Sequence, residues 1–206
     1  MTLTTHGHDD HTAGNTMMLE DYPKMKIFGC AQDNIPGLTD EVVDGSEIKL
    51  RELTIKAIHV PCHTRGSICY YLTSSREDKK AVFTGDTLFL AGCGKFFEGG
   101  PSDMVAAMDK LKRLPDDTAV HSGHEYAYEN LMFATRIAEQ VNSEAKIKLS
   151  AAISLMKTGI LESTIKEEKR YNPFMRADKR TVLPHLENRS AIFIMNKLRW
   201  LKNMAK

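Results

Sequence analysis

The first residues of the chain carry a dense group of side chains that ligate metals. Three histidines and two aspartates lie within the sequence THGHDDH, which runs from Thr5 to His11. In an extended segment His6 and His8 can point the same way, because alternate residues share a face. Asp10 and His11 then lie within reach of a second centre. Imidazole nitrogens and carboxylate oxygens suit zinc, iron or manganese, so two ligand sets this close together predict two metal ions rather than one.

A metal centre needs further ligands, and three candidates lie at the ends of predicted strands. These are His63 in VPCHTRGS, Asp86 in FTGDTLF and His124 in HSGHEY. Each follows a short β-like run and precedes a glycine or a turn-forming segment, where side chains from several strands converge. A lone histidine such as His59 is more typical of a packed or exposed residue. The predicted metal ligands are therefore His6, His8, Asp10, His11, His63, Asp86 and His124.

The composition is that of an ordinary globular protein. Of 206 residues, 42% are hydrophobic and 27% are charged, and the net charge of +1 gives no reason to expect nucleic acid or a membrane surface as a partner. No apolar run has the length of a membrane span, and the first residues lack the basic start and apolar core of a signal peptide. The four cysteines are Cys30, Cys62, Cys69 and Cys93, and none of them forms a CxxC pair. This scattered spacing in a chain of this length predicts reduced thiols rather than a disulfide scaffold.

The first part of the chain alternates short strands with helices. Hydrophobic periodicity predicts a short helix over 15–22 and a helix over 101–114 with Ser102 as its N-cap. The predicted strands lie at 26–30, as a tightly turned pair within 46–61, and at 67–75, 80–89 and 118–123.

The second part is helical. Residues 125–158 favour helix, a polar stretch at 162–173 interrupts them, and a last amphipathic helix is predicted from about His185 to Lys202. We therefore predict an α/β metal-binding domain over 1–125 and a helical domain over 126–206.

Several motifs resemble those of a known family. THGHDDH matches the THxHxDH signature of the metallo-β-lactamase superfamily. The segments GDTLFLAGCGKFFEG, HSGHEYAYENLMFA and NPFMR are similar to blocks of glyoxalase II, the hydroxyacylglutathione hydrolases. The resemblance runs from Thr5 to about Lys202. It implies an α/β (α+β) fold, an αββα sandwich, followed by a helical domain that binds glutathione.

The resemblance also implies a role for each ligand. His6, His8 and His63 would hold one metal, and Asp86 would bridge it to a second metal. The ligands of that second metal would be Asp10, His11 and His124. Two zinc ions are usual in this family, with iron or manganese also accepted. Asp86 and Asp10 would be the catalytic carboxylates. The two metals that share Asp86 would hold a bridging water, and Asp10 would both ligate a metal and orient this water.

Five further residues match positions that contact the glutathione moiety. Arg199 and Lys202 are three apart and so share a helix face; that spacing alone favours an ordinary solvated basic face, and only the family match favours a glutathione-binding pair. Phe97 stands where many relatives have tyrosine, so one hydrogen bond worth about 1 kcal/mol would be missing. The implied substrate-binding residues are Lys95, Phe97, Tyr126, Arg199 and Lys202.

The implied reaction is hydrolysis of the thioester S-D-lactoylglutathione to glutathione and D-lactate by a metal-bridged hydroxide. The expected enzyme is a cytoplasmic or mitochondrial monomer that acts on this small molecule. One alternative is another hydrolase of the superfamily. A persulfide dioxygenase is a second alternative, although dioxygenase relatives use one iron and would not need the complete second ligand set.

An inactive truncated isoform is a third alternative. Relatives place several strands and a helix before the THxHxDH signature, whereas this chain begins at it. We expect open sheet edges and exposed apolar surface if those elements are missing.

Overall fold

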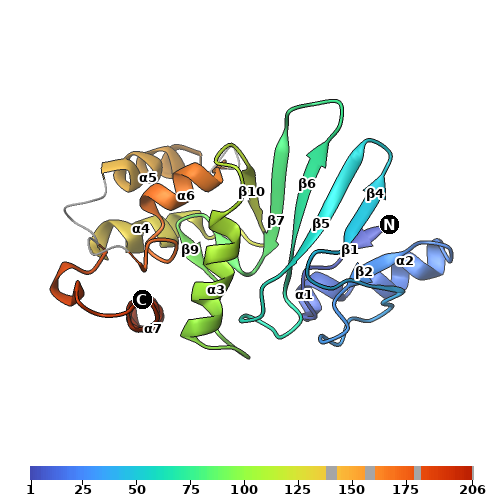
Figure 1. The fold of residues 1–206 in the computed structure, drawn as a ribbon, viewed down its shortest axis with the longest axis horizontal. Helices are drawn as coiled ribbons and strands as arrows, with labels where there is room; N and C mark the ends of the chain where they lie inside the picture. Colours follow the sequence, from blue (N-terminus) through green and yellow to red (C-terminus); the bar gives the residue numbers. More distant parts are fainter. Residues whose placement is uncertain (138–142, 156–160, 179–181, 206) are drawn as a thin grey trace.

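The computed structural model describes residues 1–137, 143–155, 161–178 and 182–205. Two sheets and a set of helices make up the fold (Figure 1). A small parallel sheet has the order β1-β2-β3, and a larger mixed sheet has the order β10-β7-β6-β5-β4. The strands of the small sheet are β1 (Thr2–Leu3), β2 (Ile27–Gly29) and β3 (Asp40–Glu41). Those of the larger sheet are β4 (Glu47–Leu50), β5 (Leu53–His59), β6 (Ile68–Ser74), β7 (Lys80–Gly85) and β10 (Ala119–Ser122).

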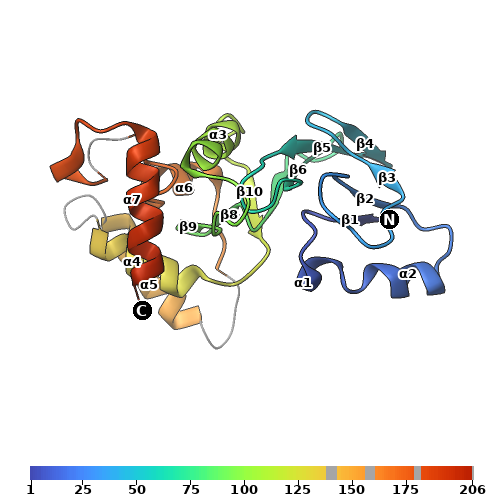
Figure 2. The same ribbon diagram turned by 90° about the horizontal axis from the view of Figure 1, so that it is seen from below.

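The helices lie outside the two sheets. α1 (Asp9–Thr12) and α2 (Asn15–Asp21) cover the outer side of the small sheet, and α3 (Pro101–Lys112) lies on the other side of the larger sheet (Figure 2). Between β7 and α3 the chain forms a small hairpin, β8 (Leu88–Phe89) and β9 (Gly92–Cys93). The C-terminal part contains α4 (Ala127–Ile137), α5 (Ser143–Leu155), α6 (Ile165–Tyr171), the 3-10 turn η1 (Pro184–Leu186) and α7 (Ala191–Met204).

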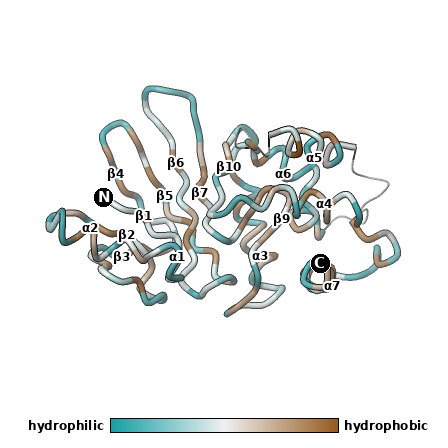
Figure 3. The backbone as a smooth tube through the Cα atoms, turned by 180° about the vertical axis from the view of Figure 1, so that it is seen from behind, coloured by the Kyte–Doolittle hydropathy of each residue, from teal (hydrophilic) through white to brown (hydrophobic). Residues whose placement is uncertain are grey.

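Alternation along the central strands produces two separate cores. Ile55, Ala57 and Tyr70 face the small sheet and pack with Cys30 and Val42. The opposite face of the larger sheet faces α3, and α7 packs against α3 in turn, in one cluster that includes Cys69, Val82, Met104, Met108 and Leu198. The turn between β6 and β7 consists of hydrophilic residues, while hydrophobic residues lie along the strands (Figure 3). The two sheets are thus held together by apolar contact, with helices on their outer sides.

Most of the predicted elements are confirmed, including the tight turn between β4 and β5, where Arg51 has a φ of +53°. The prediction of one strand over 80–89 was wrong, because β7 ends at Gly85. Gly85 has a φ of +48°, and a Cβ there would meet Thr5 Oγ1 at 2.6 Å. Glycine therefore allows the chain to turn sharply just before Asp86.

The starts of two helices differ from the prediction, and one helix was not predicted. The N-cap of α3 is Gly100 rather than Ser102, because Pro101 occupies the first helical position and the Asp103 carboxylate accepts the Gly100 N–H at 2.8 Å. The polar stretch over 162–173 contains helix α6. The last helix begins at Ala191, after the N-cap Ser190, rather than at His185. Within 125–158 the described residues from Ala127 onward form α4 and α5, while 138–142 and 156–158 lie outside the described residues.

Candidate metal centre and substrate pocket

All seven predicted ligands come together where the loops of the two sheets meet. His6 and His8 follow β1, Asp10 and His11 lie in α1, and His63 follows β5. Asp86 follows β7, and His124 follows β10. They form three overlapping groups, in each of which the ligand atoms lie within 4.8 Å of one another: His6, His8 and His63; His6, His11 and Asp86; Asp10, His11 and His124.

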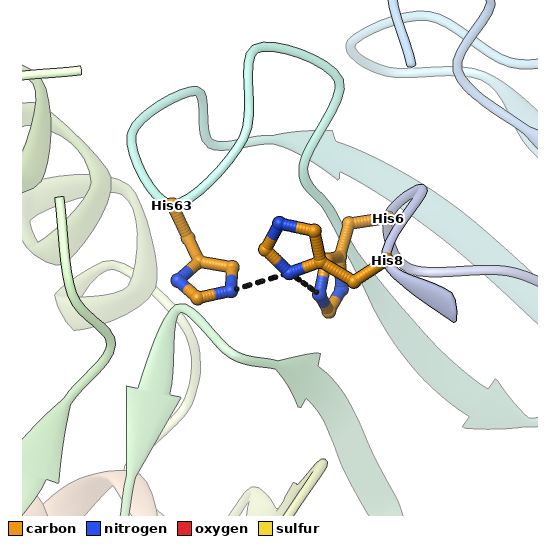
Figure 4. Close-up of side chains that lie close together, drawn as sticks. All are labelled: His6, His8 and His63. Carbon is orange, nitrogen blue, oxygen red and sulfur yellow. Dashed lines mark hydrogen bonds between the residues drawn. The ribbon is translucent and has the colours of Figure 1, made fainter. Parts of the chain in front are cut away.

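The first group consists of three imidazole rings turned toward one another (Figure 4). His8 Nδ1 lies 3.1 Å from His6 Nε2 and 3.1 Å from His63 Nε2. His63 Nδ1 lies 2.9 Å from the backbone carbonyl of Lys95, which can only accept. Nδ1 of His63 therefore carries the proton, and its Nε2 presents a lone pair to the centre of the group.

The second group combines two imidazoles with a carboxylate. His11 Nε2 and His124 Nε2 are 3.1 Å apart. Asp10 Oδ2 lies 3.2 Å from His124 Nε2 and 3.6 Å from His11 Nε2. This group is more exposed than the first, since the Asp10 side chain is 61% exposed while His6 is 1% exposed.

Asp86 lies between the two groups. Its Oδ2 is 3.5 Å from both His63 Nε2 and His124 Nε2, and its Oδ1 is 3.3 Å from His11 Nε2. Oδ1 is buried and makes no hydrogen bond to any described residue. A Cβ on Gly123 would meet this oxygen at 2.6 Å, so glycine leaves the carboxylate its space. A buried carboxylate oxygen without a donor, beside converging imidazole nitrogens, fits a cation.

The charges of the cluster follow from burial and proximity. Burial, together with the neighbouring His11, lowers the pKa of His6 to about 3, and burial also lowers the pKa of His63. Pairing with Asp86 raises the pKa of His11. Burial alone would raise the pKa of Asp86, but the surrounding histidines outweigh it and lower that pKa. Neutral His6 and His63 beside an ionised Asp86 match the donor set that a divalent metal requires, while the proton that Asp86 favours on His11 would have to leave when a metal binds.

A pocket of about 280 Å³ opens beside the cluster. His63 and Asp86 form part of its wall. The five residues predicted to bind the substrate also line it: Lys95, Phe97, Tyr126, Arg199 and Lys202. The structure therefore brings these five residues, far apart in sequence, next to the predicted metal ligands.

Aromatic and basic side chains make different parts of this wall. The Tyr126 ring stacks on His124 with centroids 5.2 Å apart, and the Phe97 ring lies 5.1 Å from that of His63. Lys202 Nζ donates to the carbonyl of Glu129 at 2.8 Å. Burial, followed by repulsion from Arg199, lowers the pKa of Lys202 to about 8. Near neutral pH the wall thus offers an ammonium group beside aromatic faces.

Arg199 has structural partners that its spacing in the sequence does not reveal. It is 8% exposed. Its Nη1 donates to the Cys93 carbonyl at 3.0 Å, and its Nε donates to Asn203 Oδ1 at 2.9 Å. Part of the guanidinium therefore ties α7 to β9, which leaves fewer of its donors for a ligand.

Two groups of supporting residues were missed by sequence reasoning. Asn130, Glu168 and Asn172 bind the backbone of the β8–β9 hairpin. Of these, Asn172 lies in the NPFMR segment and Asn130 in the HSGHEYAYENLMFA segment, so a signal existed for both. Asp33, which binds two ligand-bearing loops, lies in a stretch with no recognisable pattern.

Comparisons with known proteins agree along the whole chain. Sequence models of protein families match residues 20–124 as "Metallo-beta-lactamase superfamily" and residues 125–205 as "Hydroxyacylglutathione hydrolase C-terminus". The cytoplasmic hydroxyacylglutathione hydrolase of Arabidopsis thaliana is 41% identical over 201 residues, 96% of this chain and 78% of that protein. The probable hydroxyacylglutathione hydrolase glo2 of Schizosaccharomyces pombe is 40% identical over 204 residues, 98% of this chain and 77% of that protein.

Solved structures share the fold. ETHE1 from Myxococcus xanthus matches with a TM-score of 0.60 and 25% identity, over 90% of this chain and 67% of that chain. A metallo-beta-lactamase from Staphylococcus aureus matches with a TM-score of 0.63 and 18% identity, over 98% of this chain and 56% of that chain. The predicted sandwich with a C-terminal helical region is therefore confirmed.

Proposed function

Because the chain belongs to the hydroxyacylglutathione hydrolase family of the metallo-β-lactamase superfamily, we propose that it hydrolyses the thioester S-D-lactoylglutathione to glutathione and D-lactate. One observation carries this proposal beyond family membership. A single pocket is lined both by His63 and Asp86 of the ligand cluster and by the basic and aromatic residues expected to hold glutathione. Such a pocket can bind a substrate and expose its reacting bond to the cluster.

The superfamily implies a divalent metal, and the donor set of this cluster fits one. We assign two zinc ions, with iron or manganese as alternatives. His6, His8 and His63 would hold the first ion, and Asp10, His11 and His124 the second, with Asp86 shared. When bound, the metal supplies a Lewis acid that polarises the thioester carbonyl and lowers the pKa of the attacking water.

The residues of the chain then have distinct tasks. The Asp10 carboxylate, which extends toward solvent, orients the attacking water. Asp86 provides the negative charge shared by both ligand groups. The leaving group is the glutathione thiolate, which departs without a proton, so the site needs no strong general acid.

The pocket wall positions the glutathione moiety. The ammonium groups of Lys95 and Lys202 and the remaining donors of Arg199 match its carboxylates. Tyr126 and Phe97 supply flat apolar surface, and Phe97 offers no hydroxyl. These contacts contribute positioning rather than bond chemistry.

We further assign residues 1–125 to the metal-binding domain and 126–206 to the glutathione-binding domain of a monomer. We place the reaction in the cytoplasm, in line with the name of the Arabidopsis relative. Within the ranges that the structure describes, no helix has the length and apolar character needed to cross a membrane.

The test compares two thioesters with the zinc-reconstituted chain. The first is S-D-lactoylglutathione, and the second is the D-lactoyl thioester of N-acetylcysteamine, which lacks the glutathione carboxylates. We expect kcat/KM, measured by thiol release, to be about 10- to 100-fold higher for the glutathione thioester, since a hydrogen bond to a charged group contributes about 1.5–3 kcal/mol. Equal values would show that the pocket does not recognise glutathione.

A further inference from the structure

We propose that Asp33 is a positioning residue that latches together the two loops carrying His6, His8 and His63. The inference rests on the proposed metal site, because it concerns how that site is held before a metal arrives. Asp33 itself is not a ligand candidate, and it lies between β2 and β3, outside the segments that carry the ligands.

The Asp33 carboxylate accepts three hydrogen bonds from two distant segments. Its Oδ2 accepts the Gly7 N–H at 2.8 Å and the Thr64 hydroxyl at 2.7 Å, and its Oδ1 accepts the Gly66 N–H at 2.6 Å. Asp33 is only 9% exposed. Hydrogen bonds to an ionised carboxylate are about twice as strong as neutral ones, so this contact is a rigid one.

Two of the three donors are immediate neighbours of the histidines, and the third, Gly66, lies three residues after His63. Gly7 separates His6 from His8, and Thr64 follows His63 directly. One loop leaves the small sheet after β1, and the other connects β5 to β6 in the larger sheet. One carboxylate therefore fixes the distance between the two parts of the first ligand group.

The backbone is built for this close approach. A Cβ on Gly66 would meet Asp33 Oδ1 at 2.5 Å, and one on Gly7 would meet Asp33 Cβ at 3.0 Å. Ser67 Oγ lies 2.8 Å from Thr64 Oγ1 and accepts the Thr64 N–H at 3.1 Å, which closes the second loop. Among the described residues no lysine or arginine pairs with Asp33, so these hydrogen bonds alone stabilise its charge.

The test measures zinc affinity rather than turnover. Asp33→Asn keeps the shape, but an amide presents one acceptor oxygen and an NH₂ group, so at least one of the three donors loses its partner. Zinc binding is measured by competition with a chromophoric chelator. We expect Asp33→Asn to weaken the tighter zinc site about 10- to 100-fold, the usual cost of losing a residue that orients metal ligands.

The matched control is Val42→Ala, a substitution in the core between the sheets at a residue that belongs to neither loop. It lowers the melting temperature and should leave zinc affinity unchanged. If Asp33→Asn is insoluble, Thr64→Val removes a single hydrogen bond and should weaken zinc binding in the same direction, by a smaller factor.

Two results would overturn the proposed role of Asp33. One is that Asp33→Asn binds zinc as tightly as the wild type. The other is that Val42→Ala loses as much zinc affinity as Asp33→Asn does. Failure of the proposed reaction gives a different result. A wild-type chain that binds zinc but leaves S-D-lactoylglutathione intact refutes the substrate, while the zinc affinities of the variants still decide the role of Asp33.

Discussion

Asp86 is the residue on which both ligand groups depend. It is the one carboxylate of the described cluster with oxygens within 3.5 Å of His11, His63 and His124 together. The histidines around it keep its pKa low despite burial. Removing it takes the shared negative charge from the imidazoles and leaves the more exposed Asp10, which lies beside His11 and His124 but not beside His63, as the remaining carboxylate of the described cluster.

We predict that Asp86→Ala loses zinc and activity together. Bound zinc, measured after gel filtration, should fall below that of the wild type, and kcat/KM should drop by about 10³-fold or more, as expected when several kcal/mol of metal catalysis is lost. Asp117→Ala is the control, because Asp117 pairs with Lys80 away from the cluster. An Asp86→Ala variant with wild-type zinc content and turnover would contradict the shared-carboxylate role.

The charge state of Lys202 predicts how kcat/KM depends on pH. Its pKa of about 8, lowered chiefly by burial, means that it is an ammonium below this pH and a neutral amine above it. Only the ammonium attracts a glutathione carboxylate, so kcat/KM should fall as the pH rises through about 8. Lys202→Arg stays charged throughout this range and should remove the decline. The same decline in Lys202→Arg would assign it to another group.

The ligand types at the residue scale could be predicted from the sequence, because the HGHDDH cluster is local. The orientation of each ring could not. The proton on His63 Nδ1 is fixed by the Lys95 carbonyl, 32 residues away, and the donors of Arg199 are partly committed to Cys93. Such partners depend on tertiary contact rather than on local pattern.

At the scale of elements, the C-terminal helices hold the β8–β9 hairpin by its backbone. Asn130 of α4 donates to the Leu90 carbonyl at 3.1 Å, and Asn172, which follows α6, donates to the Gly92 carbonyl at 3.0 Å. The Glu168 carboxylate of α6 accepts the Ala91 N–H at 3.0 Å. The hairpin connects Asp86 to Lys95, so the helical part positions both the cluster and the pocket.

Helix α6 was missed because its stretch is polar, yet its sequence contained a start signal. Thr164 and Glu167 form a capping box, in which each side chain accepts the backbone N–H of the other residue. The pattern Thr-x-x-Glu would have predicted this helix. The burial of Glu168 carries no such signal, since a charged residue is expected at the surface.

We predict that Asn172→Ala lowers the free energy of unfolding by about 1–3 kcal/mol, because the buried carbonyls of Gly92 and Phe89 lose their donor. Chemical denaturation measures the change. The exposed Asn188 provides the control, since Asn188→Ala should change stability by less than about 0.5 kcal/mol. Equal stabilities for the two variants would show that the helical part does not fix the hairpin.

At the scale of the whole molecule, the site exists because two sheets and a helical part meet at one place. Hydrophobic alternation predicted most strands, and the family resemblance supplied their arrangement as a sandwich. The break after Gly85 was not predicted, although the apolar run stops at Phe83 and residues 84–87 (TGDT) contain a glycine that favours a turn. Asp33 was missed because its partners lie 26 to 33 residues away in the sequence.

If the cluster holds metal for hydrolysis of a glutathione thioester, turnover must depend on zinc. We would titrate the metal-free chain with zinc and follow S-D-lactoylglutathione hydrolysis at each step. We predict that turnover rises with added zinc, reaches a plateau when about two ions per chain are bound, and disappears with a chelator. Turnover that survives the chelator, or zinc binding without any hydrolysis, would show that the cluster is not the metal centre of such a reaction.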